Sequence, residues 1–158
     1  MKSQLEEKQR LINAFLADTK KTSFYMEELA RWAYENELWY PSTEAIVHQL
    51  KNELADAARQ IHYTDPQGRR VRALHPARYK GKQAPLWDDM REASRQHMET
   101  AFQQRRQQIV SDCYHLKQDV DSYNENYNPS SKPIQLELDF TDDVEELELE
   151  ERGIAEIA

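Results

Sequence analysis

The sequence is poor in the residues that crosslink a chain, make tight turns or cross a membrane. Its single cysteine, Cys113, excludes an internal disulfide and fits a reducing compartment. Only three glycines and six prolines argue against a β protein with many hairpins, because each tight turn needs its own turn residues. No apolar run is long enough to span a membrane, and residues 1–10 lack the apolar core of a signal peptide. These absences predict a cytoplasmic protein with no membrane partner.

The residue clusters that catalysis and metal binding need are also missing. The histidines are spread over several expected elements, without the spacing of metal ligands: His48, His62, His75, His97 and His115. Cys113 and His115 are two residues apart, which a helix turns to different sides, so Cys113 is interpreted as a small core residue. We find no phosphate-binding glycine loop, no serine elbow and no paired carboxylates in an apolar setting. We therefore expect a non-enzymatic protein with no catalytic residue, no metal and no cofactor.

The net charge of −8 is unevenly distributed along the chain. Residues 133–158 hold ten acidic residues and one arginine, a local charge of −9, which leaves +1 for the other 132 residues. Within these, residues 59–82 contain seven basic residues and one acid, Asp65. Such asymmetry is typical of a nucleic-acid contact next to an acidic tail. The alternative is a solvated, arginine-rich loop.

Apolar residues at helical spacing predict three helices in the first part of the chain. The first covers Ser3 to Leu16, with Ser3 and Glu6 in the capping-box pattern. The second runs from about Ser23 to Leu38. Pro41 and Ser42 then form a helix-start signal for a third helix over residues 43–59. That helix has an expected buried stripe: Ile46, Val47, Leu50, Leu54, Ala57 and Ala58.

After the third helix the apolar period changes from 3.6 to 2. Ile61 and Tyr63 alternate with polar residues, as do Val71 and Ala73, and a turn sequence with proline second and glycine last (residues 65–68) lies between them. We therefore predict one β-hairpin with a basic tip. Three helices followed by such a hairpin is the element order of a winged helix.

Residues 15–74 resemble the winged-helix domains of bacterial transcription regulators of the multiple-antibiotic-resistance type. Residues 26–30 (MEELA) are similar to the "ELA" helix of that family, residues 41–43 to the start of its recognition helix, and residues 65–72 (DPQGRRVR) to its "DP..RR" wing. The second helix and its turn are longer than in the family, and the third helix lacks the usual glycine near its end. The resemblance implies DNA binding through the third helix and the wing.

The rest of the chain is predicted to hold a linker, a long helix and a tail. Residues 76–86 are interpreted as a basic linker, and residues 87–124 as a long helix whose apolar spacing from Ile109 is that of a coiled coil. We expect homodimerisation through residues 98–123, with packing back onto its own domain as the alternative. Residues 125–158 are predicted to be a flexible acidic tail. The fold class is thus mainly α, a winged helix-turn-helix over residues 1–75 with these appendages.

The leading functional hypothesis is a DNA-binding regulatory or accessory protein of bacterial or phage type, which takes double-stranded DNA as partner. Candidate base-reading residues on the third helix are Thr43, His48, Lys51 and Asn52. Candidate phosphate contacts are the basic residues of the wing and linker: Arg69, Arg70, Arg72, Arg78, Lys80 and Lys82. The third helix also carries Glu44, Glu53 and Asp56, an unfavourable charge balance for a DNA groove.

The alternative hypothesis is a protein-protein adaptor that uses the same fold, the long helix and the acidic tail. Residues 135–140 (QLELDF) resemble the peptide by which bacterial replication and repair proteins dock on the sliding clamp. In such peptides the apolar side chains enter a cleft and the glutamine forms a polar anchor, which gives the candidate partner contacts: Gln135, Leu136, Leu138 and Phe140. An edge strand, a solvated tail and a DNA mimic are the other interpretations of this acidic region.

Overall fold

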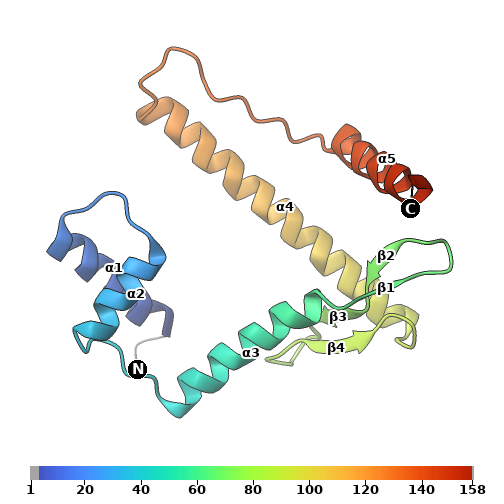
Figure 1. The fold of residues 1–158 in the computed structure, drawn as a ribbon, viewed down its shortest axis with the longest axis horizontal. Helices are drawn as coiled ribbons and strands as arrows, with labels where there is room; N and C mark the ends of the chain where they lie inside the picture. The colour runs from blue at the N-terminus through green and yellow to red at the C-terminus, as the bar shows by residue number, and fades with distance from the viewer. Residues whose placement is uncertain (1–3, 158) are drawn as a thin grey trace. The chain divides into compact units, whose positions relative to one another are not determined.

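The computed structural model describes the backbone of residues 4–157 and the side chains of residues 4–154. Over this range the chain is mainly helical, with two small antiparallel hairpins (Figure 1). It divides into two compact units, residues 1–73 and residues 74–158. The mainly helical fold class is confirmed, whereas the winged-helix assignment stays a prediction.

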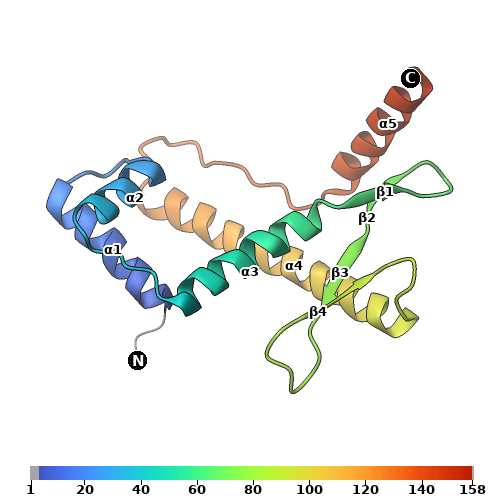
Figure 2. The same cartoon turned by 60° about the horizontal axis from the view of Figure 1, so that its bottom comes forward.

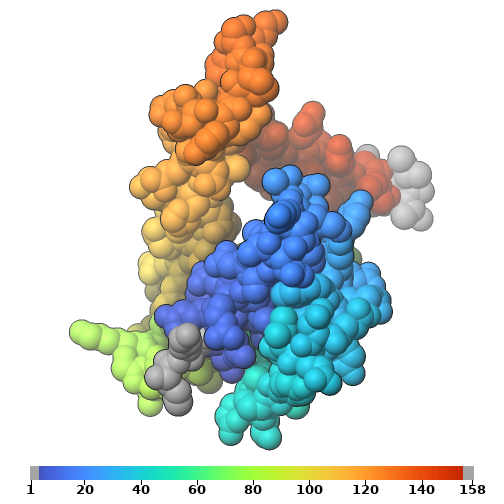
Figure 3. All heavy atoms as spheres, turned by 90° about the vertical axis from the view of Figure 1, so that its left-hand side faces the viewer, coloured from blue at the N-terminus to red at the C-terminus, as the bar shows by residue number. Residues whose placement is uncertain are grey.

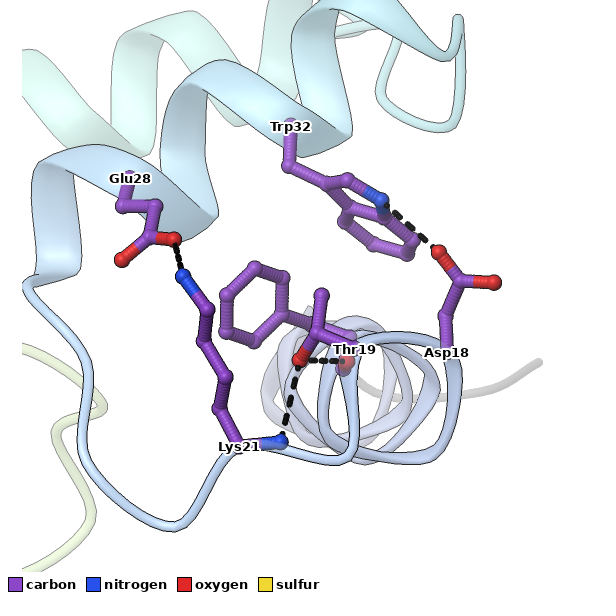
Figure 4. Close-up of polar contacts among 6 residues, drawn as sticks. Asp18, Thr19, Lys21, Glu28 and Trp32 are labelled. Atoms are coloured by element: carbon purple, nitrogen blue, oxygen red, sulfur yellow. Dashed lines mark hydrogen bonds and ion pairs between the residues drawn. The ribbon is translucent and has the colours of Figure 1, made fainter.

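Helices α1 (Gln4–Thr19) and α2 (Met26–Glu35) pack side by side in the first unit. Phe15 is only 1% exposed, and its ring meets the edges of Phe24 and Trp32 at centroid distances of 5.3 and 5.5 Å. The Trp32 indole donates a hydrogen bond to Asp18 at 3.3 Å, and Lys21 pairs with Glu28 (Figure 4). Aromatic packing and these polar contacts therefore hold α2 on α1. Ser3, the predicted N-cap, lies outside the described residues.

Helix α3 (Thr43–Arg59) begins where the sequence predicted it to begin. The Ser42 hydroxyl accepts a hydrogen bond from the Ala45 N–H at 3.2 Å, which satisfies one of the free amides of the first turn. The expected buried stripe is wrong, however, because no residue of α3 is buried and Leu50 is 51% exposed. Within the first unit neither α1 nor α2 packs closely on α3. Helical periodicity predicts an apolar face, but it does not supply the surface that would cover that face.

Strands β1 (His62–Thr64) and β2 (Arg70–Arg72) form the predicted hairpin. The Gly68 N–H donates to the Asp65 carbonyl at 2.9 Å, and Gly68 has a φ of +83°, a conformation that glycine adopts without strain. The Ala73 N–H also donates to the Ile61 carbonyl at 2.9 Å, which extends the pairing beyond the strands. The turn chemistry read from residues 65–68 is confirmed.

Two strands overlap the ends of the segment interpreted as a linker, residues 76–86, and residues 78–85 are the loop between them, so the expectation of a single hairpin is wrong. Strand β3 (Leu74–Ala77) pairs antiparallel with β4 (Leu86–Asp89), and Pro76 lies opposite Trp87. Proline and glycine had indicated a break, but a proline is tolerated in an edge strand of a two-stranded sheet. Strand β3 alternates between half-buried and fully buried residues, and it packs against the long helix (Figure 2).

The long helix α4 (Arg95–Asn126) begins later than the predicted residue 87, because residues 87–89 belong to β4. Its start is set by Ser94, whose hydroxyl accepts a hydrogen bond from the His97 N–H at 3.1 Å. The predicted flexible tail contains a second unexpected element, helix α5 (Thr141–Ile157), after a non-helical stretch over residues 127–140. The Asp139 carboxylate accepts from the Thr141 N–H at 3.1 Å and so caps α5.

We predict that Phe15→Ala destabilises the first unit by about 3–5 kcal/mol, because it removes a fully buried ring and its two edge contacts. Chemical unfolding followed by tryptophan fluorescence measures the change, since Trp32 packs on Phe15. Tyr25→Ala is the matched control, because Tyr25 is a nearby aromatic residue that is exposed. Equal unfolding midpoints for the two variants would contradict this account of the core.

Candidate nucleic-acid interface and docking segment

The β1–β2 hairpin has one basic face and one apolar face. Its register pairs His62 with Arg72 and Thr64 with Arg70, and side chains two apart on a strand share a face. His62, Thr64, Arg70 and Arg72 therefore point to the same side of the hairpin. Tyr63 and Val71, which are half-buried, occupy the opposite side. On the side away from the apolar residues Arg70 is exposed, whereas Arg72 is half-buried and its Nε atom is buried, so Arg70 presents most of the charge there.

Asp65 organises the tip of this hairpin. One of its carboxylate oxygens accepts from the backbone N–H groups of Gln67 and Arg69 at 3.0 and 2.8 Å. The other oxygen accepts from Arg69 Nε at 2.7 Å. Partial burial raises the pKa of Asp65, but the hydrogen bonds and positive charge of Arg69 outweigh it and hold that pKa below its usual value. Arg69 is therefore committed to the turn, and Arg70 is the exposed arginine beside it.

The candidate base-reading residues of α3 are all exposed. His48 and Asn52 lie one turn apart, with their side chains 3.3 Å from each other, so they occupy the same side of the helix. Thr43 lies in the first turn, directly after the Ser42 cap. Near the other end of α3, Asp56 binds Arg59 at 2.7 Å, which neutralises one of the few basic groups of this helix.

The remaining predicted phosphate contacts belong to the second unit, in the loop between β3 and β4. Arg78, Lys80 and Lys82 are exposed there. The backbone of Arg78 is held by Gln104, whose side chain accepts from the Arg78 N–H at 2.8 Å and donates to the Arg78 carbonyl at 2.7 Å. The predicted basic patch is therefore divided between the two units, with Arg69, Arg70 and Arg72 in the first.

A buried polar cluster that the sequence did not reveal joins the second hairpin to α4. His97 is 3% exposed, its Nε2 lies 2.8 Å from the His75 carbonyl oxygen, and its Nδ1 lies 2.7 Å from the Tyr79 hydroxyl. Because a carbonyl only accepts, Nε2 carries a proton and donates it, and the Tyr79 hydroxyl can donate to Nδ1. Spacing along the chain could not show this, because residues 75, 79 and 97 meet only once the hairpin packs on the helix. The cluster fixes backbone positions and holds no group of metal ligands.

The predicted docking peptide lies in the extended stretch before α5. None of the described strands pairs with residues 133–140, and the Phe140 side chain is 43% exposed. Upstream, the Asn124 side chain binds both backbone groups of Ile134, with its amide donating at 3.0 Å and its oxygen accepting at 2.8 Å. Gln135 and Leu138 are exposed and Leu136 is half-buried. The chain is thus held just before this peptide, at Ile134, and the peptide is extended from there to the start of α5.

Comparisons with protein-family models, with curated proteins and with solved structures found no match to this chain. Among the described residues there is no group of three or more histidine, cysteine or acidic side chains arranged to hold a metal ion. No helix in the described part of the chain has the length and apolarity needed to cross a membrane. Any function must therefore be argued from the residues of the chain itself.

Asp89, at the end of β4, has a lowered pKa. Its carboxylate accepts two hydrogen bonds from the Arg91 guanidinium, at 3.0 and 2.7 Å, and one from the Arg91 N–H at 2.9 Å. These bonds lower the pKa of Asp89 from 3.8 to about 2. A carboxyl whose pKa is depressed in the folded state stabilises that state above its unfolded pKa, and this contribution is lost as the pH falls through the folded value.

We predict that Asp89→Asn flattens the acid dependence of stability between pH 3.8 and about 2, because the variant lacks the carboxylate whose pKa is lowered over that range. Urea unfolding at a series of pH values, followed by circular dichroism, measures the slope. Asp88→Asn is the matched control, because the Asp88 carboxylate accepts the Asp89 N–H and not the arginine. Parallel acid profiles for wild type and Asp89→Asn would overturn the assignment.

Proposed function

We propose that this chain is a non-enzymatic DNA-binding regulatory or accessory protein, in which the basic face of the β1–β2 hairpin contacts the phosphate backbone. The observation that carries the proposal is the strand register, which gathers Arg70, Arg72 and His62 on one side of the hairpin. Arginine side chains on a two-stranded ribbon suit backbone contact, because neutralising phosphates releases bound counterions. Arg69 supports the tip through Asp65 and contributes less charge than the sequence indicated.

Helix α3 is assigned the smaller part in this proposal. Lys51 and Asn52 are exposed and could pair with guanine and adenine edges. Glu44, Glu53 and Asp56 on the same helix oppose close approach to phosphates. We therefore assign most of the binding energy to the hairpin of the first unit; Arg78, Lys80 and Lys82 of the second unit are a separate candidate for phosphate contact. Binding of this kind depends strongly on salt and weakly on sequence.

Replacing both Arg70 and Arg72 by alanine is predicted to weaken duplex binding and to lower the slope of log K against log salt by about one for each phosphate that the variant no longer neutralises. Fluorescence anisotropy of a labelled mixed-sequence duplex, titrated at several salt concentrations, measures both. The matched control is Arg31→Ala with Arg95→Ala, which removes the same charge from exposed positions on α2 and α4. Equal effects of the two pairs, or no binding by wild type at low salt, would sink the proposal.

A second candidate function, docking on a protein partner, rests on a separate observation. Residues 135–140 are extended, lie outside both hairpins and present apolar side chains to solvent. A peptide that is already extended and attached at one end loses less conformational entropy when it binds than a disordered tail does. The resemblance to clamp-binding peptides makes a bacterial sliding clamp the partner to test, with Leu136, Leu138 and Phe140 entering its cleft and Gln135 as the polar anchor. The acidic helix α5 would then lie next to the bound partner.

If this docking occurs, replacing Leu138 and Phe140 by alanine will weaken binding of the whole chain to a purified bacterial sliding clamp by at least about tenfold, because apolar anchors dominate such interfaces. Biolayer interferometry with immobilised clamp gives the affinities. Val144→Ala with Leu147→Ala is the control, since it removes exposed apolar groups from the neighbouring helix α5. Clamp binding that both pairs reduce equally, or no clamp binding at all, would exclude this peptide as the docking site.

A further inference from the structure

Packing within the second unit covers the N-terminal part of α4, where the Phe102 ring lies 5.4 Å from the His75 ring. His97 and Ala101 are buried, and Gln104 binds both backbone groups of Arg78. These residues are four and three apart, so they form a single stripe on the helix. Strand β3 packs against this stripe, at the N-terminal part of α4. The hairpin thus covers residues 97–104 of α4, through this stripe and through Phe102.

An apolar seam lies on a different side of the same helix. Successive residues turn by about 100°, so Ile109 lies about 140° around the helix from Gln104, and Val120 about 160°. Ile109 is 53% exposed and Leu116 is 46% exposed. Figure 3 shows the gold part of α4 at the surface of its unit on the side toward the viewer. The seam repeats with spacings of 4, 3, 4 and 3: Ile109, Cys113, Leu116, Val120 and Tyr123.

We propose that this seam pairs with the same seam of a second copy of the chain, in a parallel, in-register coiled coil. Alternating spacings of four and three keep the apolar residues of two helices in contact as they wind around each other. Strand β3 packs on residues 97–104 of α4 and does not cover residues 109–123. The seam therefore begins beyond the segment of α4 that the hairpin contacts. The pairing therefore requires no rearrangement of the hairpin, and it does not depend on DNA binding.

The charges beside the seam set the orientation of the two helices. Asp112 and Asp119 flank the seam on one side, and Lys117 flanks it on the other. In a parallel pair, a residue on one flank of the seam faces the partner residue that lies five positions later on the other flank. Asp112 of each copy therefore faces Lys117 of the other copy. An antiparallel pair brings like flanks together, which places acid against acid and Lys117 against Lys117. Complementary charge thus favours the parallel arrangement.

Lys117 is available for this exchange. It now binds Asp121 on its own helix at 2.5 Å, and both side chains are more than half exposed. An exposed pair of this kind is weakly held, because water screens the charges and two mobile side chains must be ordered. Lys117 can therefore leave Asp121 and bind Asp112 of the second copy at little energetic cost. The two ion pairs would lie on either side of Leu116.

The whole chain is predicted to form a concentration-dependent dimer in sedimentation equilibrium. Under a mild oxidant it should crosslink through Cys113, which an in-register parallel pair brings to the same level of the seam. Moving the thiol to the far side of the helix, with Cys113→Ser and Gln118→Cys together, should abolish the crosslink and leave the dimer intact. A monomer at all concentrations, or equal crosslinking from both thiol positions, overturns the proposal.

A charge exchange tests the orientation without touching the apolar core. Lys117→Asp places two acids together and should weaken the dimer at least about tenfold, whereas Lys117→Asp combined with Asp112→Lys should restore it. Both positions lie outside the buried stripe of α4, so folding is not at risk, and circular dichroism checks that helix content is kept. A dimer that is indifferent to Lys117→Asp, or one that the double change fails to restore, excludes the parallel pairing described here.

Discussion

The second unit depends on one constraint: its two-stranded hairpin is attached to a single helix. Side chains of that helix bind backbone groups of the hairpin. A two-stranded sheet is too small to be stable alone, so β3 and β4 need a surface to pack on. Helix α4 supplies it with residues of two kinds. Ala101 of α4 is small and buried, as is Ala77 of β3, so the helix and the strand approach closely. His97 binds the backbone of His75, and Gln104 binds the backbone of Arg78. Loss of His97 would leave the buried His75 carbonyl without this partner, and a larger residue at Ala101 or Ala77 would clash in the packed interface.

Local signals in the sequence predicted local structure well. Ser42 caps α3 through Ala45, and the sequence around Asp65 and Gly68 makes the predicted turn, because both depend only on residues within a few positions. The second hairpin was missed for the same reason. Pro76 and Gly81 are local signals for a break, and the pairing of Pro76 with Trp87 depends on a helix that begins at residue 95. Where tertiary contacts decide the conformation, local chemistry alone cannot predict it.

The candidate site shows the same division between what the sequence indicates and what packing decides. Charge counting over residues 59–82 indicated one basic patch, but it could not show that Asp65 binds Arg69 or that the basic residues fall in two units. Periodicity likewise identified the apolar face of α3, whereas the exposure of Leu50 and Leu54 depends on the absence of close packing by α1 and α2. The histidines appeared scattered along the chain, and only folding brings His97 to the carbonyl of His75.

Helix α4 connects the separate features of the second unit, because each of its ends binds a different segment of the chain. At its N-terminal end the hairpin occupies one face, and at its C-terminal end Asn124 fixes the backbone of Ile134. Both attachments use amide side chains that bind an N–H and a carbonyl together, as a neighbouring strand would. The helix between them keeps an apolar face whose exposure is costly to a single copy in water. In the proposed dimer, a partner with the same sequence would remove that cost, because it offers both the matching spacing of apolar residues and the opposite flanking charge.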